Sequence, residues 1–394
     1  MKSPTRLAIV VSHPIQYYVP LYRRLAQRKD VQIKVFYTWH AGQKQVHDRG
    51  FGIALAWDIP LTEGYEHELV PNVAADPGTH HFFGLRNPTL VDRVAGWKPD
   101  CVHVTGWAWR SHLEALRAFR RKGVATLFRG DSHLLDGKTQ GPRWWMKHAL
   151  LKCIYAWPSA FAYVGEANRA YYRAFGVAAD RLVHCPHSIE VDRFAEPSDV
   201  YEAEAARWRH ELGIAADRCV LLFAGKFEPK KRPLDLMRAV QESGAANLLL
   251  VLVGDGEQAA AVKSIAAMAP DRFRVLPFQN QSRMPVVYRL GDLFVLPSAY
   301  GETWGLAVNE AMSCGRAVIV SNRVGCARDV VDDSCGRVFP WDDLSEMLRQ
   351  MNQLSGEKSE LLAMGRRASS RVRQFDLPQT ESTLMAAVAK VLAR

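Results

Sequence analysis

The sequence predicts an α/β protein built from two doubly wound domains of similar size. Short apolar strands alternate with helical stretches along the whole chain, and the alternation starts afresh after a Pro-, Asp- and Ser-rich break at 186–199. The length of 394 residues also suits two domains. Alternating strands and helices imply parallel sheets covered by helices on both faces. Ligands of such folds bind at the carboxyl ends of the strands, so we expect the site in a cleft between the domains.

The individual elements follow from runs rich in Val, Ile, Leu and Phe, separated by amphipathic helical patterns. In the first half the expected strands are 6–12, 31–37, 101–106, 124–130 and 159–165, and the expected helices are 18–29, 109–122, 142–156 and 166–175. In the second half the expected strands are 219–225, 247–253, 273–277, 292–296 and 317–320, with helices between them. We place the domains at 1–195 and 196–375, and we expect a C-terminal helix within 376–394 to pack back on the first domain.

Composition restricts the class of protein. Hydrophobic residues make up 48% of the chain, which is enough for sizeable cores, and no apolar run reaches the ~18 residues of a membrane-spanning helix. The first apolar run ends at Val11 and continues into "SHPIQYY", which is no cleavage site, so we expect a buried strand rather than a signal peptide.

The cysteines and the charge indicate the surroundings and the partners. Seven cysteines without a CxxC pair argue against a disulfide framework or a structural zinc site, and they fit a reducing cytosol. The formal net charge of +10 suggests polyanionic partners, which include nucleotide phosphates, nucleic acid and anionic lipid. No nucleic-acid-binding module is visible in the sequence, so we expect no nucleic-acid partner.

Two carboxylates stand eight residues apart in "SAYGETWGLAVNEAMSCGRAVI" (298–319), around a Gly-containing turn that opens into an apolar helix. The N–H groups at the start of a helix suit a phosphate, so the amides of 303–306 are candidates to hold one. Glu302 precedes this helix and Glu310 lies about one and a half turns inside it, so the two side chains can reach opposite ends of one elongated ligand. The ordinary alternative is an acidic residue favoured by the helix dipole and a solvated Glu310.

This segment resembles the E-x7-E segment of family-4 retaining glycosyltransferases with the GT-B fold. The match comprises Pro297, Ser298, Glu302, Gly305, Leu306, Glu310, Ala311, Met312 and Gly315. The resemblance implies that Glu302 lies against the donor sugar and that Glu310 binds the ribose of the nucleotide. It also implies that the amides between them meet the diphosphate, and it makes Gly301, Thr303, Trp304, Gly305 and Leu306 donor-binding candidates.

A basic loop precedes this segment in "VLLFAGKFEPKKRPLDLMRAV" (220–240). By itself the loop is better explained by solubility than by phosphate binding. It resembles the "GRLxxxKG" segment of the same family, and Lys226 and Lys231 match the spacing of the two cations there. Lys226 stands where the family usually has Arg, and Arg232 stands where it usually has Gly. The resemblance implies that both lysines stabilise the departing diphosphate, so that no metal is needed.

Three further segments continue the resemblance in the family's order, so that it covers 185–320. "CPHSIEVDRF" (185–194) is similar to "PNGVDxxRF", and "LVGDGEQ" (252–258) is similar to the "GDGPE" turn, which makes Gly254 a donor-binding candidate. In "VLPFQNQSRMPVVYRLGDLFVLPS" (275–298) the match implies that Gln279 lies beside the nucleobase.

The N-terminal half, which binds the acceptor in this family, matches less well. "VSHPIQYYVPLYRRLA" (11–26) replaces the usual Gly-rich turn; His13 either faces the site or is a buried or capping residue. "SHPIQYY" also resembles a subgroup of bacterial enzymes found with surface-polysaccharide genes. In "TLFRGDSHLLDG" (126–137), Arg129, Asp131 and His133 are acceptor- or sugar-side candidates. We favour Asp131 for a catalytic role, and a turn cap is its alternative.

The segment "GPRWWMKHALLKCIYAW" (141–157) combines Trp and Leu with Arg and Lys on one expected helix. Such a helix suits either an anionic membrane surface or packing of its apolar face on the sheet.

The resemblance as a whole implies a retaining, metal-independent glycosyltransferase without a cofactor. It would move a sugar from a nucleotide diphosphate sugar to a saccharide or lipid-linked saccharide, in bacterial surface polysaccharide or glycolipid synthesis. We expect a cytoplasmic protein, with a peripheral place on the inner face of the cell membrane as an option. A non-catalytic nucleotide- or glycan-binding protein on the same fold and a nucleotide-sugar epimerase are the alternatives.

Overall fold

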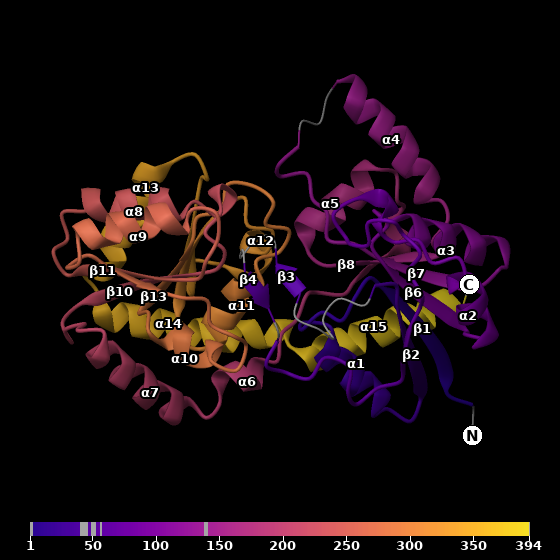
Figure 1. Ribbon diagram of the computed structural model, residues 1–394, viewed down its shortest axis with the longest axis horizontal. Helices are drawn as coiled ribbons and strands as arrows, with labels where there is room; N and C mark the ends of the chain where they lie inside the picture. Colours follow the sequence, from indigo (N-terminus) through magenta and orange to yellow (C-terminus); the bar gives the residue numbers. More distant parts are fainter. Residues whose placement is uncertain (1–2, 40–45, 49–52, 56, 138–140, 394) are drawn as a thin grey trace. The chain divides into compact units, whose positions relative to one another are not determined.

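The computed structural model describes residues 3–39, 46–48, 53–55, 57–137 and 141–393 (Figure 1). The chain divides into two compact units. Unit 1 comprises Met1–Val46, Ile59–His187 and Leu377–Arg394, and unit 2 comprises His47–Asp58 and Ser188–Asp376. Residues 188–195, which we assigned to the first domain from the sequence, group with unit 2.

Unit 1 is built on a seven-stranded sheet in which neighbouring strands run parallel. Its strands, in spatial order, are β5 (His67–Leu69), β2 (Val31–Tyr37), β1 (Thr5–Val11), β6 (Cys101–Thr105), β7 (Ala125–Arg129), β8 (Ala160–Tyr163) and β9 (Leu182–His184). The five strands predicted for the first half are all present.

Alternating side chains of this sheet form two separate cores. Ala8 and Val10 of β1 face one core, to which α2 (Leu90–Gly96), α3 (Arg110–Arg121), α4 (Pro142–Ile154) and α5 (Glu166–Ala174) contribute. Leu7, Ile9 and Val11 face the other core, which α1 (Val19–Ala26) and α15 (Leu377–Leu392) cover. The period-two pattern of a strand thus separates the two helical layers.

Helix α15 belongs to unit 1 although it follows unit 2 in the sequence (Figure 1). It buries Leu384 and Val388 in the core that α1 shares. Its Glu381 accepts hydrogen bonds from Arg24 at 2.8 Å and from Arg28 at 2.9 Å. This is the helix that we expected to pack on the first domain.

Unit 2 contains a six-stranded sheet whose neighbouring strands are also parallel. The spatial order is β12 (Phe273–Leu276), β11 (Leu248–Val253), β10 (Cys219–Ala224), β13 (Leu293–Leu296), β14 (Ala317–Ser321) and β15 (Gly336–Phe339). The other two strands, β3 (Val46–Asp48) and β4 (Ile53–Leu55), pair in a small sheet of their own. The five strands predicted for the second half are present, and β15 extends the sheet by one.

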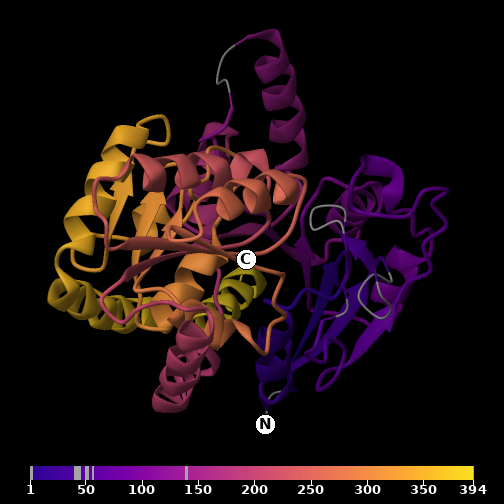
Figure 2. The ribbon, with the colours of Figure 1, turned by 60° about the vertical axis from the view of Figure 1, so that its left-hand side comes forward.

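Helices cover the large sheet of unit 2 on both faces (Figure 2). One core contains residues of α8 (Pro233–Glu242), α9 (Ala259–Met268), α13 (Leu344–Ser355) and α14 (Lys358–Val372). Helices α6 (Val191–Ala195), α10 (Met284–Arg289) and α11 (Leu306–Ser313) contact one another, and α7 (Ser198–Glu211) contacts α10. Among the described residues, the remaining short helices of unit 2 are α12 (Ala327–Val330) and the 3₁₀ turns Pro229–Lys231 and Arg373–Phe375, and those of unit 1 are the 3₁₀ turns Phe82–Gly84 and Ala179–Arg181.

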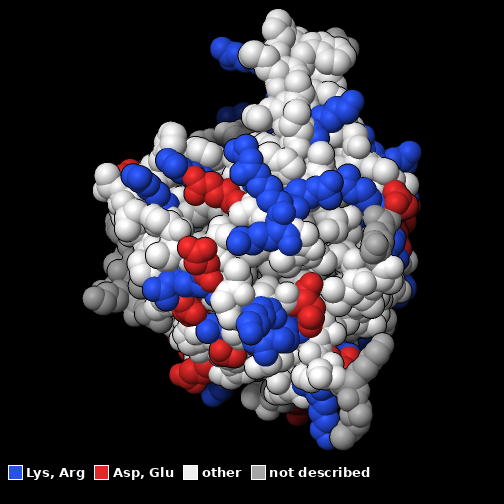
Figure 3. Space-filling model, turned by 90° about the vertical axis from the view of Figure 1, so that its right-hand side faces the viewer, with Lys and Arg blue, Asp and Glu red and all other residues white. Residues whose placement is uncertain are grey.

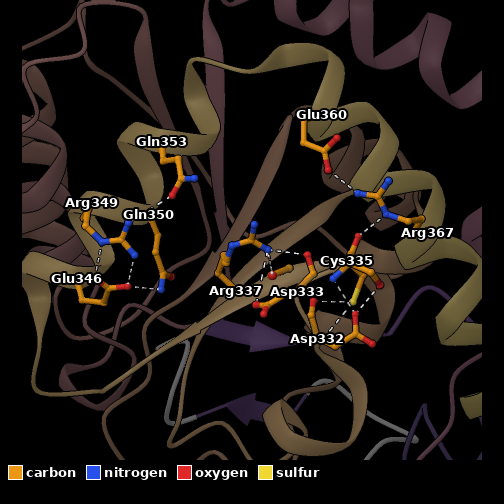
Figure 4. A network of polar contacts seen from close by, with 12 residues as sticks. Asp332, Asp333, Cys335, Arg337, Glu346, Arg349, Gln350, Gln353, Glu360 and Arg367 are labelled. Carbon is orange, nitrogen blue, oxygen red and sulfur yellow. Dashed lines mark hydrogen bonds and ion pairs between the residues drawn. The ribbon is translucent and has the colours of Figure 1, made fainter.

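A polar network lies on α13, α14 and the turn before β15 (Figure 4). Glu346 receives a hydrogen bond from Arg349 at 2.7 Å, and this contact lowers the pKa of Glu346 to about 2. Arg367 donates to Glu360 at 2.5 Å and to the carbonyl of Ser334 at 2.6 Å. These groups are solvent-exposed, so we assign them little weight in the stability of unit 2.

Among the described residues, no helix has both the length and the apolar character needed to cross a membrane.

Candidate functional site

Four of the segments that match the family motifs are loops that follow strands of the large sheet in unit 2, whereas 185–194 follows β9 of unit 1. These loops are 225–232 after β10, 254–258 after β11, 277–283 after β12 and 297–305 after β13. Because the strands run parallel, their carboxyl ends lie at one edge of the sheet, and the loops gather there. The fold therefore brings Lys226, Lys231, Gly254, Gln279 and Glu302 to a single edge of one unit.

The loops after β10 and β11 lie in direct contact. The amide of Phe227 donates to the carbonyl of Asp255 at 2.8 Å, and the amide of Gln258 donates to the carbonyl of Phe227 at 3.0 Å. Gly254 has a φ of +152°, and a Cβ there would lie 2.0 Å from the carbonyl oxygen of Gly225. Glycine at 254 is thus required for the close approach of the two loops.

Lys231 and Glu302 form an ion pair that joins the loop after β10 to the loop after β13. Lys231 Nζ lies 2.9 Å from Glu302 Oε2, and both side chains are mostly buried. The hydroxyl of Ser298 donates to the same carboxylate oxygen at 3.2 Å. The cation and the carboxylate predicted to flank a sugar diphosphate are therefore paired with each other.

The other cations of the basic loop have different surroundings. Lys226 is half-buried next to Gly225 at the end of β10. Lys230 pairs with Glu228 at 3.0 Å. Arg232 has a left-handed backbone (φ +55°), and its side chain pairs with Asp235 at 2.7 Å and donates to the carbonyl of Trp341. Lys230 and Arg232 thus hold local structure, whereas Lys231 reaches a predicted site residue.

The turn before α11 is shaped by backbone that favours glycine. Gly301 and Gly305 have φ values of +68° and +92°, and a Cβ at Gly305 would lie 2.7 Å from Val324. Thr303 is half-buried in this turn, and α11 begins at Leu306. The helix start predicted to face a phosphate is therefore present at the same edge as Lys231.

Trp304 differs from its neighbours because its side chain points into the core. The indole is buried, and its Nε1 donates to Asn309 Oδ1 at 3.0 Å. A donor-binding role of this residue would have to come from its main chain. The ring instead fixes the start of α11.

Glu310 is buried inside α11, with an exposed fraction of 3%. The hydroxyl of Tyr288 donates to Glu310 Oε2 at 2.5 Å. The second oxygen, Oε1, is buried and has no hydrogen-bond partner among the described residues. Burial raises the pKa of Glu310 to about 7, against the opposing effect of the Tyr288 hydrogen bond. An unsatisfied buried carboxylate oxygen is costly, and a ligand hydroxyl would satisfy it.

Sequence reasoning did not single out Tyr288, Trp57 or Asp58. Tyr288 lies on α10, and the only signal for it in the sequence is its place as the tyrosine of "VVYRLGD". Asp58 accepts a hydrogen bond from the amide of Ser282 at 3.2 Å, and the ring of Trp57 lies 6.4 Å from that of Phe278. Trp57, in the segment that groups with unit 2, therefore lies beside the loop that contains Gln279. The side-chain amide of Gln279 itself donates to the carbonyl of Pro277 at 3.1 Å.

His13 of unit 1 lies just after β1, at the carboxyl edge of that sheet. Its Nδ1 is 3.0 Å from the hydroxyl of Ser12, and its ring meets that of Trp39 edge-on at 5.5 Å. Burial lowers the pKa of His13 to about 4, so the imidazole is neutral near pH 7.

The three polar candidates after β7 have unequal surroundings. Arg129 is buried and donates to the carbonyls of Cys185 at 2.8 Å and Pro186 at 3.2 Å, so it fixes the loop after β9. His133 accepts a hydrogen bond at Nδ1 from the amide of Leu135 at 3.2 Å. Asp131 is half-buried between them. Arg129 therefore has a clear structural task.

His112 is a further buried histidine that sequence reasoning missed. Its Nε2 lies 3.0 Å from the hydroxyl of Thr38, and its Nδ1 lies 2.9 Å from the carbonyl of Thr105. It thereby ties the ends of β2 and β6 together.

Asp76, His80 and His81 are spaced as metal ligands could be, within the part of the chain that the structure describes. His80 Nε2 lies 2.9 Å from Asp76 Oδ2, so a hydrogen bond accounts for this exposed group without an ion. None of the three was a predicted site residue.

Comparison with known proteins finds a family model that matches part of unit 2. Residues 204–371 match the model of the family "Glycosyl transferases group 1". The D-inositol 3-phosphate glycosyltransferase of Xylanimonas cellulosilytica is 27% identical over 299 residues, which cover 71% of this chain and 69% of that protein. The chain spans about half the length of several other curated relatives that it matches.

Solved structures give the fold of the whole chain. A glycosyltransferase from Rickettsia africae superposes with a TM-score of 0.76 at 13% identity, with 99% of each chain covered. The Anabaena protein Alr3699/HepE in complex with UDP-glucose superposes with a TM-score of 0.71 at 15% identity, with 98% of this chain and 99% of that chain covered. The predicted GT-B fold and the resemblance to group 1 glycosyltransferases are confirmed.

Proposed function

We propose, from the glycosyl transferases group 1 domain that residues 204–371 form, that this chain moves a sugar from a nucleotide diphosphate sugar to a hydroxyl acceptor. The observation that supports this most is the edge of unit 2 at which Lys231 and Glu302 are paired at 2.9 Å. In the same unit the buried Glu310 has one oxygen without a partner among the described residues. A nucleotide sugar has hydroxyls at both ends and phosphates between them. Along 302–310 the chain offers groups in the same order: the carboxylate of Glu302, the main-chain N–H groups at the start of α11 and the carboxylate of Glu310.

Each group has a distinct task in this proposal. Glu310 accepts hydrogen bonds from the ribose, and Tyr288 holds its carboxylate in place. The turn 301–306 and the first turn of α11 bind the diphosphate through main-chain N–H groups and the helix dipole. Glu302 accepts hydrogen bonds from hydroxyls of the transferred sugar.

Cations stabilise the leaving group. As the bond between the sugar and the diphosphate breaks, negative charge builds up on the phosphate, and Lys226 and Lys231 neutralise it together with the start of α11. These groups supply the positive charge that a metal provides elsewhere, so we propose transfer without a metal or another cofactor. We further propose that the configuration at the sugar carbon is retained.

The acceptor side is assigned to unit 1. His13, Asp131 and His133 follow strands at the carboxyl edge of its sheet, and Asp131 is our candidate for a catalytic group there. The acceptor is a saccharide or a lipid-linked saccharide, and the pathway is bacterial surface polysaccharide or glycolipid synthesis in the cytoplasm. The Anabaena protein solved with UDP-glucose supports a nucleotide sugar as the donor.

A thermal-shift panel tests the donor site. The protein is heated with UDP, GDP, ADP or TDP and with their sugars, each with and without EDTA. We expect one base to stabilise the protein selectively, EDTA to leave the shift unchanged, and Glu310→Ala to abolish it. Absence of any shift would contradict the donor site, and a shift that EDTA removes would contradict metal independence. A shift without turnover on any acceptor would favour a non-catalytic binding protein.

A further inference from the structure

Helix α4 exposes an apolar face. Trp145, Met146 and Leu150 are 63%, 66% and 54% exposed, and Ala149 and Cys153 beside them are also exposed. Positions 146, 149, 150 and 153 follow the i, i+3, i+4, i+7 pattern, so they share one side of the helix. Three large apolar side chains at such exposure within six positions form a surface that water solvates poorly.

The opposite side of α4 is firmly attached to unit 1. Leu151 and Ile154 are buried in the core that α3 and α5 share. The rings of Trp144 and His148 lie 6.1 Å and 5.6 Å from that of Phe175. The helix is therefore apolar on two sides, one packed and one exposed. Figures 1 and 2 show that its N-terminal part projects away from the sheet of the unit.

Positive charge flanks the exposed side. The sequence from Gly137 to Gly165 contains four Lys or Arg residues and no Asp or Glu. Arg143 and Lys152 are exposed at the margins of the apolar face, and Lys147 extends over the ring of Tyr171 at 5.4 Å. Figure 3 shows further Lys and Arg side chains gathered below the protrusion that α4 forms.

We propose that α4 docks this chain on an anionic lipid bilayer. Trp145, Met146 and Leu150 would enter the boundary between headgroups and acyl chains, and Arg143 and Lys152 would meet lipid phosphates. Charge decides between this occupant and a second copy of the chain, because a copy would place the same cations against one another without a single carboxylate in the segment. The binding is peripheral and does not depend on the sugar-transfer proposal.

Cys153 supplies a probe at the docking face, since it is the exposed member of the seven cysteines and the other six are buried. The full chain is labelled there with an environment-sensitive fluorophore and mixed with vesicles. We expect a blue shift with equimolar phosphatidylglycerol and phosphatidylcholine, and none with phosphatidylcholine alone. A spectrum that neither vesicle changes would overturn the proposal.

Variants of the unlabelled chain test the residues by vesicle sedimentation. Met146→Glu with Leu150→Glu should weaken binding to the anionic vesicles about tenfold or more, because two apolar side chains that would enter the bilayer are lost. Leu362→Glu, at an exposed leucine of α14, is the matched control and should bind as the unchanged protein does. Equal binding of all three proteins would refute the assignment to α4.

Two further measurements keep the outcome clear. The thermal shift with nucleotide should be the same in the double variant and the unchanged protein, which shows that the variant is folded and separates this inference from the donor site. The mass in solution should also be the same. If the unchanged protein bound no vesicles and the double variant had half its mass in solution, the face would be assigned to a second copy of the chain instead.

Discussion

Among single residues, Glu310 is expected to make the free energy of unfolding depend on pH. Its pKa is about 7 in the folded protein against an ordinary value of 4.5, because burial disfavours the charged form. Between these two values the folded protein binds more protons at this position than the unfolded chain does. The contribution of Glu310 to the free energy of unfolding therefore falls as the pH rises from about 4.5 to about 7 and stays low above it.

Glu310→Gln tests this effect in the ligand-free protein. Glutamine is neutral and keeps an oxygen that can accept the hydrogen bond of Tyr288. We expect the variant to unfold at a higher temperature than the unchanged protein at pH 8, and the difference to approach zero at pH 5. Thermal unfolding at several pH values measures this. A difference that does not vary with pH would show that Glu310 is not the group that titrates.

Glu302 is expected to act in turnover more than in nucleotide binding. Glu302→Gln weakens hydrogen bonds from the sugar to a charged acceptor, so we expect turnover to fall about 10- to 100-fold. Nucleoside diphosphate affinity should not fall, because Lys231 loses its carboxylate partner and becomes available to phosphate. Steady-state kinetics and calorimetry measure the two effects.

The exposed Glu242 at the end of α8 provides the control for that experiment. Glu242→Gln should leave both quantities unchanged. If Glu302→Gln kept full turnover, its place against the donor sugar would be wrong.

Sequence patterns located residues better than they described their surroundings. The resemblance to two family motifs predicted that Lys231 and Glu302 lie near one ligand, and the structure pairs them. Nothing in the sequence distinguishes a tryptophan that contacts a ligand from one that packs beneath a helix, so the burial of Trp304 was not foreseen. Tyr288 was missed because its role depends on a contact between α10 and α11.

At the scale of elements, the contact between the loops after β10 and β11 depends on Gly254. Gly254→Ala would place a Cβ 2.0 Å from a carbonyl oxygen, on backbone that side chains rarely adopt. We expect the free energy of unfolding to fall by about 2 kcal/mol or more, and nucleotide binding to weaken with it. Gly244→Ala, where an added Cβ meets nothing within 4 Å, should be nearly neutral in the same denaturation assay. Equal effects of the two substitutions would contradict the steric argument.

The elements that the sequence revealed are those with long apolar runs. Each predicted strand recurs in the structure within a few residues of its expected ends, and β11 with its run "LLLVLV" is buried throughout. The strands β5 and β9 have three residues each, which is too short for a period-two pattern to stand out. The helical segment 142–156 was ambiguous in the sequence because α4 has one packed and one exposed apolar side.

At the scale of the whole molecule, unit 1 depends on a helix from the far end of the chain. Leu384 of α15 is buried in the core that α1 shares, so Leu384→Ala should lower the stability of unit 1 by about 2–5 kcal/mol. Leu392→Ala, at an exposed position of the same helix, should change it by about 0.5 kcal/mol or less. Thermal unfolding and limited proteolysis measure the effect. If Leu384→Ala proved as harmless as Leu392→Ala, α15 would be dispensable for this core.

The return of α15 also sets an order of events on the ribosome. Residues 188–376 emerge between the sheet of unit 1 and the helix that completes its cover, and at about 5–20 residues per second this takes roughly 10–40 s. Throughout that interval the nascent chain presents the apolar side of β6, β7, β8 and β9 without α15. Unit 2 can therefore complete its folding before unit 1 does, and the uncovered strands of unit 1 are a surface that chaperones can bind in the meantime.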